Sequence, residues 1–191
     1  MMFKKVGYAC ICSALIGCGG SDTPLPTDTT LYGFEVPEID SRTKKRYLDA
    51  INRLRSRTQN CGKEGIKPPA SALWWNDALY KAAYEHSRDL AISNTFSHKG
   101  SGGDSDWTAR EQGLKRGSRF DERIKKNGYT EYKSIGENIA KNQASIEQVT
   151  ASWMNSPGHC ANIMNPAFTE IGMAKVEKDG ASYWTQNFAG R

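Results

Sequence analysis

Two histidines and one glutamate are the residues whose types are best suited to chemistry. His98 follows a serine, whereas Glu137 and His159 each follow a glycine. Imidazole titrates near neutral pH and, in its neutral form, binds metals. Two histidines and a glutamate also form a common ligand set of catalytic zinc. We expect the three side chains to lie on separate loops that converge on one cleft.

Other kinds of reactive centre are less favoured. The same three residues could relay protons without a metal, and no His-Glu-x-x-His motif is present to decide between these roles. A thiol mechanism at Cys160 is disfavoured because Cys61 is an obvious disulfide partner. A serine hydrolase lacks its Gly-x-Ser-x-Gly elbow. His86 falls on an apolar helical stripe, and we interpret it as a hydrogen-bonded core residue.

The N-terminal part predicts export and anchoring. Residues 1–17 place two lysines before a short apolar stretch, as in a signal peptide. Leu-Ile-Gly-Cys, ending at Cys18, has the pattern of a bacterial lipobox, in which the cysteine is lipidated and becomes the first residue. The alternative is an ordinary secretory signal with an incidental cysteine. Residues 18–38 are rich in Gly, Pro and Thr and predict a flexible tether, and residues 39–191 the folded domain.

This reading implies a protein lipid-anchored in the bacterial cell envelope and facing away from the cytoplasm. Its partner there would be the membrane, through lipidated Cys18. In an organism with two membranes we expect the outer one, because Gly19 is not the aspartate that typically retains lipoproteins at the inner membrane.

Composition excludes several classes. The chain has 191 residues and a formal net charge of +5, which falls to +3 without residues 1–17. Nucleic-acid binding is not indicated, because a dense basic stripe with aromatic platforms is missing. No stretch reaches the roughly 18 apolar residues of a membrane span. Cys61 and Cys160 are left as a pair in an oxidising compartment, which predicts a disulfide; two free buried thiols are the alternative.

The periodicity predicts helices first and a hairpin last. Apolar stripes and capping residues indicate helices at four places: about 41–57, 77–93, 118–127 and 145–156. The polar, glycine-rich stretch 99–118 is interpreted as a solvated loop. Its Asp104 and Asp106 could instead bind a hard cation, but the rest of a calcium-loop spacing is missing. Two strand-like runs, 169–176 and 181–188, flank an Asp-Gly turn, and a further strand is expected near 135–140.

Several short segments together resemble the CAP superfamily, which groups cysteine-rich secretory proteins, venom antigen 5 and plant pathogenesis-related proteins with bacterial relatives. They include Phe-Ser-His at 96–98, Gly-Glu-Asn-Ile-Ala at 136–140, Ser-Pro-Gly-His at 156–159, Asn-Ile-Met-Asn-Pro at 162–166 and Tyr-Trp-Thr-Gln at 183–186. The resemblance covers about residues 44–189. It implies an α+β fold, an α-β-α sandwich with a small, mainly antiparallel central sheet and a broad surface cleft.

The resemblance also places His98, Glu137 and His159 in that cleft, where some family members hold a divalent metal. A second family glutamate has no counterpart, because residues 153–156 contain no acid. The Tyr-Thr-Gln that follows Gly-His in eukaryotic members is replaced by residues 160–162, Cys-Ala-Asn. Both departures resemble the bacterial branch.

Three functions are compatible with these residues. The favoured one is a binding module for a lipid or cell-wall ligand at His98, Glu137 and His159, with no cofactor required and with or without a divalent ion. The alternative is a metal-dependent hydrolase in which the two histidines hold zinc and Glu137 is a ligand or general base. A surface adhesin or spacer with a vestigial cleft is the third. Enzymatic activity is therefore left open.

Overall fold

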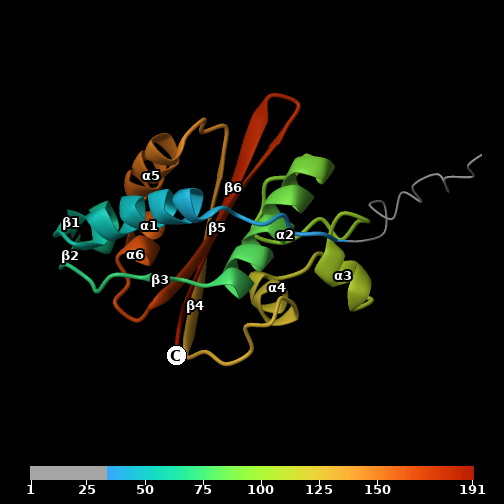
Figure 1. Cartoon of the computed structure of the whole chain (residues 1–191), viewed down its shortest axis with the longest axis horizontal. Coiled ribbons are helices and arrows are strands. Elements are labelled where there is room, and N and C mark those ends of the chain that lie inside the picture. Colours follow the sequence, from blue (N-terminus) through green and yellow to red (C-terminus); the bar gives the residue numbers. More distant parts are fainter. Residues whose placement is uncertain (1–33) are drawn as a thin grey trace, which may run out of the picture. The chain divides into compact units, whose positions relative to one another are not determined.

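A four-stranded sheet lies at the centre of the computed structural model, which describes residues 34–191 (Figure 1). The strands lie in the order β3 (Trp74–Trp75), β5 (Glu170–Lys178), β6 (Ala181–Gly190) and β4 (Ser134–Lys141). β3 runs parallel to β5, and the other neighbours are antiparallel. The expected small, mainly antiparallel sheet is therefore confirmed. The predicted signal peptide, the lipidation of Cys18 and tether residues 18–33 lie outside the described residues.

The predicted C-terminal hairpin is confirmed. β5 and β6 pair without interruption from Glu170 opposite Ala189 to Lys178 opposite Ala181. Asp179 and Gly180 form the turn with φ values of 51° and 78°. Two positive φ angles are the requirement of the two-residue turn whose twist matches that of the strands, and Asp-Gly tolerates them well.

Helices cover both faces of the sheet (Figure 1). One layer contains α1 (Ser41–Arg55), α5 (Ile146–Met154) and α6 (Pro157–Ile163); the other contains α2 (Asp77–Ser93), α3 (Trp107–Glu111) and α4 (Phe120–Lys126). Because strand side chains alternate, Trp184 and Phe188 of β6 join the first core, while Tyr183 and Ala189 face the second layer. The α-β-α sandwich is therefore confirmed.

Capping residues explain where the helices begin. Asn76 accepts hydrogen bonds from the amides of the first turn of α2, which spans the predicted 77–93. α1 begins at Ser41 and is capped by Asp40, whose carboxylate accepts from the amide of Thr43. The cap of α4 is Arg119, whose backbone amide donates to the carboxylate of Glu122.

The interpretation of 99–118 as a solvated loop is wrong for its second half. Asp106 is buried and caps the short helix α3. Its carboxylate also accepts from the amides of Gly102 and Ser118, which holds the two ends of the stretch together. Asp104, by contrast, is exposed. The carboxylate of Asp106 therefore accepts hydrogen bonds from backbone amides that have no partner within a helix. This is why it is buried, although the sequence pattern predicted that it would be solvated.

The predicted Cys61–Cys160 disulfide is present, with the two Cα atoms 5.4 Å apart. It joins α6 to a small antiparallel sheet and a 3-10 turn: β1 (Gln59–Asn60), η2 (Gly62–Glu64) and β2 (Ile66–Lys67). Buried Arg55 also donates to the carbonyls of Ile163, Asn165 and Phe168. Both connections fix the position of α6, which contains His159.

β4 is an edge strand of the sheet, and side chains from the first layer cover its unpaired edge. Asn162 donates to the carbonyl of Glu137, and the Trp153 indole donates to the carbonyl of Ile139. These contacts satisfy two edge acceptors that a neighbouring strand would otherwise fill. They also hold α5 and α6 beside the strand that contains Glu137.

Residues 34–39 pack against the second layer. The ring of Phe34 stacks on Trp107 with centroids 4.9 Å apart. Val36 and Ile39 lie against the cluster around Tyr80, whose hydroxyl donates to the carbonyl of Pro37. The last residues of the predicted tether are thus part of the packed unit, and all the described core lies within residues 34–191.

Candidate functional site

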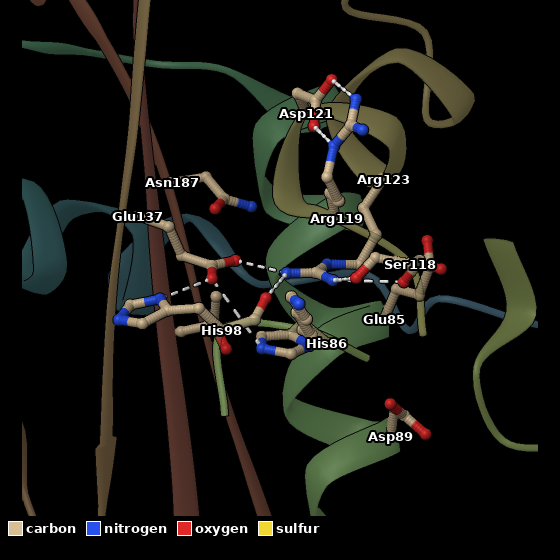
Figure 2. A network of polar contacts seen from close by, with 12 residues as sticks. Glu85, His86, Asp89, His98, Ser118, Arg119, Asp121, Arg123, Glu137 and Asn187 are labelled. Atoms are coloured by element: carbon tan, nitrogen blue, oxygen red, sulfur yellow. Dashed lines mark hydrogen bonds and ion pairs between the residues drawn. The ribbon is translucent and has the colours of Figure 1, made fainter. Parts of the chain in front are cut away.

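Glu137 is the centre of a buried polar network (Figure 2). Strand alternation in β4 directs its side chain toward α2 and α4, beside Asn187 on the paired strand. The carboxylate is only 1% exposed. Its Oε1 lies 2.9 Å from Nδ1 of His98, and its Oε2 lies 2.9 Å from Nη2 of Arg123. Both oxygens of the carboxylate therefore have a partner.

The charge of Glu137 is maintained by its neighbours. Burial raises the pKa of a carboxyl group, but the positive charge of Arg123 and the hydrogen bonds from Arg123 and His98 lower the pKa of Glu137 to about 2. Glu137 is consequently ionised at any physiological pH. An ionised carboxylate can only accept hydrogen bonds, so Nδ1 of His98 carries the hydrogen.

His98 lies at the surface end of this network. It belongs to the segment between α2 and α3, and its side chain is 53% exposed. Arg123 donates to its backbone carbonyl over 3.0 Å, while Glu137 binds its ring. With Nδ1 engaged, Nε2 is the ring atom left to act as a hydrogen-bond acceptor, a proton acceptor or a metal ligand.

A second imidazole, that of His86, contacts the same segment from the interior of the protein. His86 is fully buried on α2, and its Nε2 lies 2.9 Å from the carbonyl of Ser97, directly before His98. Burial, reinforced by the charge of Arg123, lowers the pKa of His86 to about 3, so the ring is neutral. The interpretation of His86 as a hydrogen-bonded core residue agrees with this placement. The sequence did not indicate that it borders Glu137, with Nε2 3.8 Å from Oε1.

His159 approaches from the other helical layer. It lies in the first turn of α6, and the side-chain amide of Asn138 donates to its backbone carbonyl over 3.2 Å. Burial lowers the pKa of the half-buried imidazole, and the charge of nearby His98 lowers it further. Within residues 34–191, no hydrogen bond or ion pair joins this ring to His98 or Glu137.

The expectation of three converging loops is therefore wrong in its details. Only His98 lies on a loop, whereas Glu137 is in β4 and His159 is in α6. Glu137 joins a strand because β4 pairs along its whole length with β6. Pro157 at the first position of α6 extends that helix to include His159, since proline suits the start of a helix.

Arg123 is the functional residue that the sequence reading missed. It is 1% exposed, and its guanidinium reaches Glu137, the His98 carbonyl and Ser118. A signal was present, because Phe120, Arg123 and Ile124 have the spacing of one helix face. An arginine on an apolar face predicts a buried acidic partner.

The residues fit a metal only in part. Within the described range, no group of three or more His, Cys, Asp or Glu side chains is arranged to hold a metal ion. Both oxygens of Glu137 are already engaged, so the ligands on offer are the imidazoles of His98 and His159. Glu137 would then orient His98 from behind, as carboxylates behind metal-binding histidines commonly do. Such a metal would act as a Lewis acid.

In the described residues, three helices lie on each face of a mainly antiparallel sheet, and a histidine and a glutamate pair at its edge. These features place the chain in a class of α-β-α sandwich proteins. The model of the cysteine-rich secretory protein family, CAP, matches residues 48–188. The chain belongs to this family.

Relatives with similar sequences and folds include bacterial proteins. An uncharacterized protein, YkwD of Bacillus subtilis, is 35% identical over 171 residues, which cover 90% of this chain and 56% of YkwD. The chain thus spans just over half of that relative. An extracellular SCP-domain protein from Bacillus anthracis has 23% identity and a TM-score of 0.58, over 82% of this chain and 45% of that one. An outer surface protein of Borrelia burgdorferi has 21% identity and a TM-score of 0.59, over 82% and 99%.

Proposed function

We propose that the chain is an extracytoplasmic binding domain, anchored to the cell envelope through lipidated Cys18, whose ligand is recognised at His98. The supporting observation is the double engagement of Glu137, by His98 on one oxygen and Arg123 on the other. A carboxylate held in this way orients a neighbouring group and is not free to exchange protons with a substrate. Acid–base catalysis usually combines two groups with separated pKa values, and Glu137, ionised and engaged at both oxygens, is not available as one of them.

The exposed chemistry favours a ligand with a hydroxyl or amide donor beside an apolar surface. Nε2 of His98 would accept the hydrogen bond. Phe96, two residues earlier, is 52% exposed, and Ile92 near the end of α2 is 45% exposed. A lipid with a hydroxylated headgroup and a sugar–peptide fragment of the cell wall both combine these properties.

Two observations support the location proposed for the domain. Buried disulfides such as Cys61–Cys160 persist in oxidising compartments outside the cytoplasm. Two solved structures with this fold are of an extracellular protein and an outer surface protein. Among residues 34–191, no helix combines the length and apolar character needed to cross a bilayer.

The direct test is NMR titration of protein with labelled histidines. Micelles of a short-chain phosphatidylglycerol and soluble cell-wall fragments serve as the two ligand sources. We expect one of them to shift the His98 ring signals saturably, and His98→Ala to abolish binding. The matched control is Lys99→Ala, which removes an exposed neighbour. Unchanged His98 signals with both ligands, or equal binding by His98→Ala, would contradict the proposal.

A metal-dependent hydrolase is the second candidate, and one observation favours it. Nδ1 of His98 is bound by a buried carboxylate, the arrangement typical of metal-ligating histidines. Zinc titration with elemental analysis separates the candidates. Stoichiometric zinc that is lost in both His98→Ala and His159→Ala would favour the hydrolase, and retention of zinc by either variant would remove it.

A further inference from the structure

We propose that the surface formed by residues 107–133, which comprises α3, α4 and their flanking loops, docks on an anionic phospholipid bilayer. This docking surface lies in the second helical layer, away from the disulfide (Figure 1). The proposal rests on the anchoring through Cys18 proposed above, and it adds a defined orientation of the domain on the membrane.

The net positive charge of the domain is concentrated on this surface. Residues 107–133 contain eight basic and four acidic residues, a net charge of +4, against +5 for the whole of residues 34–191. One of the eight, Arg123, is buried against Glu137. Arg116 pairs with Glu122 and Arg119 with Asp121. Arg110 pairs with Glu111. The four basic residues that remain are the lysines Lys115, Lys125, Lys126 and Lys133, against one remaining acid, Glu131.

Aromatic rings lie among these lysines. The ammonium of Lys126 lies 4.8 Å from the ring centroid of Trp107, and that of Lys125 lies 5.6 Å from that of Tyr132. Trp107 and Tyr132 are both partly exposed. Indole and phenol rings favour the headgroup region of a bilayer, where one end is apolar and the other is hydrated. Lysines beside them add attraction to anionic headgroups. This mixture favours a lipid surface over a purely polyanionic wall polymer.

The chain reaches the packed domain at this surface. Phe34, the first described residue, stacks on Trp107 and lies near Tyr84 of α2. Cys18 precedes Phe34 by 16 residues, which can span at most about 55 Å. A lipid on Cys18 would therefore leave the docking surface within reach of the bilayer.

The test is a vesicle-binding assay with residues 34–191, which contain the whole described core and the disulfide. This fragment lacks Cys18, so binding reports the surface and not the anchor. Lys125→Glu combined with Lys126→Glu changes the charge on the docking surface. Arg57→Glu combined with Lys63→Glu makes the same change at exposed positions near the disulfide. Circular dichroism confirms that both variants are folded.

We expect the fragment to bind vesicles containing phosphatidylglycerol and to bind phosphatidylcholine vesicles at least about tenfold more weakly, since each lysine near an anionic surface contributes about fivefold. The Lys125/Lys126 variant should lose at least about tenfold, and the Arg57/Lys63 variant less than about twofold. No binding to anionic vesicles, equal losses in both variants, or tighter binding to soluble teichoic acid than to the vesicles would overturn the proposal. Any of these results would leave the ligand test at His98 unaffected.

Discussion

Arg123 and Glu137 form a buried ion pair, and the same arginine nitrogen also binds the backbone of His98. Nη2 of Arg123 lies 2.9 Å from Oε2 of Glu137 and 3.0 Å from the His98 carbonyl. The other carboxylate oxygen binds the His98 ring. One guanidinium thus determines both where the His98 segment lies and, through Glu137, which ring nitrogen faces solvent. The site is consequently only as rigid as α4.

Removing Arg123 should destabilise the protein strongly. Arg123→Met leaves an ionised carboxylate buried without its counter-charge, which costs roughly 3–5 kcal/mol of the free energy of unfolding. Urea unfolding measures the loss. The control is Arg119→Met at the start of the same helix, whose ion pair with Asp121 is exposed and should matter little. Equal effects of the two substitutions would show that Arg123 is not the centre of the network.

As the pH is lowered, the protein should begin to lose stability at a higher pH than the titration of its carboxylates alone predicts. Burial lowers the pKa of His86 from 6.5 to about 3, so the folded state disfavours protonation. The stability from neutral His86 is complete above pH 6.5 and is lost as pH falls toward 3, by about 1.4 kcal/mol per pH unit. The free energy of unfolding should therefore begin to fall below pH 6.5. His86→Asn should flatten the decline between pH 6.5 and the carboxylate range.

His159 shifts in the same direction as His86, because burial also lowers its pKa. His159→Asn is therefore the matched control, and it should flatten the profile less than His86→Asn. The contribution of Glu137 is lost at a lower pH than that of the histidines. Its stabilisation is present above pH 4.5 and disappears as pH falls toward about 2. A profile that stays flat down to pH 4.5 in the unmodified protein would contradict the burial of a neutral His86.

The disulfide should contribute substantially to stability. Cys61 and Cys160 are 99 residues apart, and closing a loop of that size is worth on the order of 4–5 kcal/mol in the chain-entropy account. Cys61→Ala combined with Cys160→Ala should lower the thermal midpoint sharply. It should also weaken ligand binding, because His159 precedes Cys160 in α6. An unchanged midpoint would show that the packing of α6 is sufficient without the bond.

Gly172 should not tolerate a side chain. A Cβ there would lie 2.0 Å from the amide nitrogen of Tyr80, so β5 and the start of α2 would have to separate. Gly172→Ala should cost about 3 kcal/mol. Gly158→Ala is the control, since nothing lies within 4 Å of a Cβ in that first turn of α6. It should be neutral or stabilising by about 0.5–1 kcal/mol. Similar costs at both glycines would contradict the tight contact of α2 with β5.

Local signals in the sequence predicted the elements but not the network that joins them. Asn76 with its apolar stripe defined α2, and Asp179-Gly180 defined the hairpin, because each depends on nearby residues. α3 was not predicted, because it is held by distant contacts: buried Glu85 of α2 accepts from the amide of Thr108. The nearness of His98 to Glu137 followed from the family resemblance, which places both in one cleft, but their hydrogen bond was not predicted. The part played by Arg123 did not, because it depends on how α4 packs against β4.

The tautomer of His98 tests the central claim most directly. Long-range proton–nitrogen NMR correlations of the folded protein, recorded where the imidazole is neutral, show which ring nitrogen carries the hydrogen. We predict that Nδ1 carries the hydrogen and donates it to Glu137, while Nε2 is unprotonated and faces solvent. This arrangement should be lost in Glu137→Gln. A hydrogen on Nε2 of His98 in the unmodified protein would contradict the account.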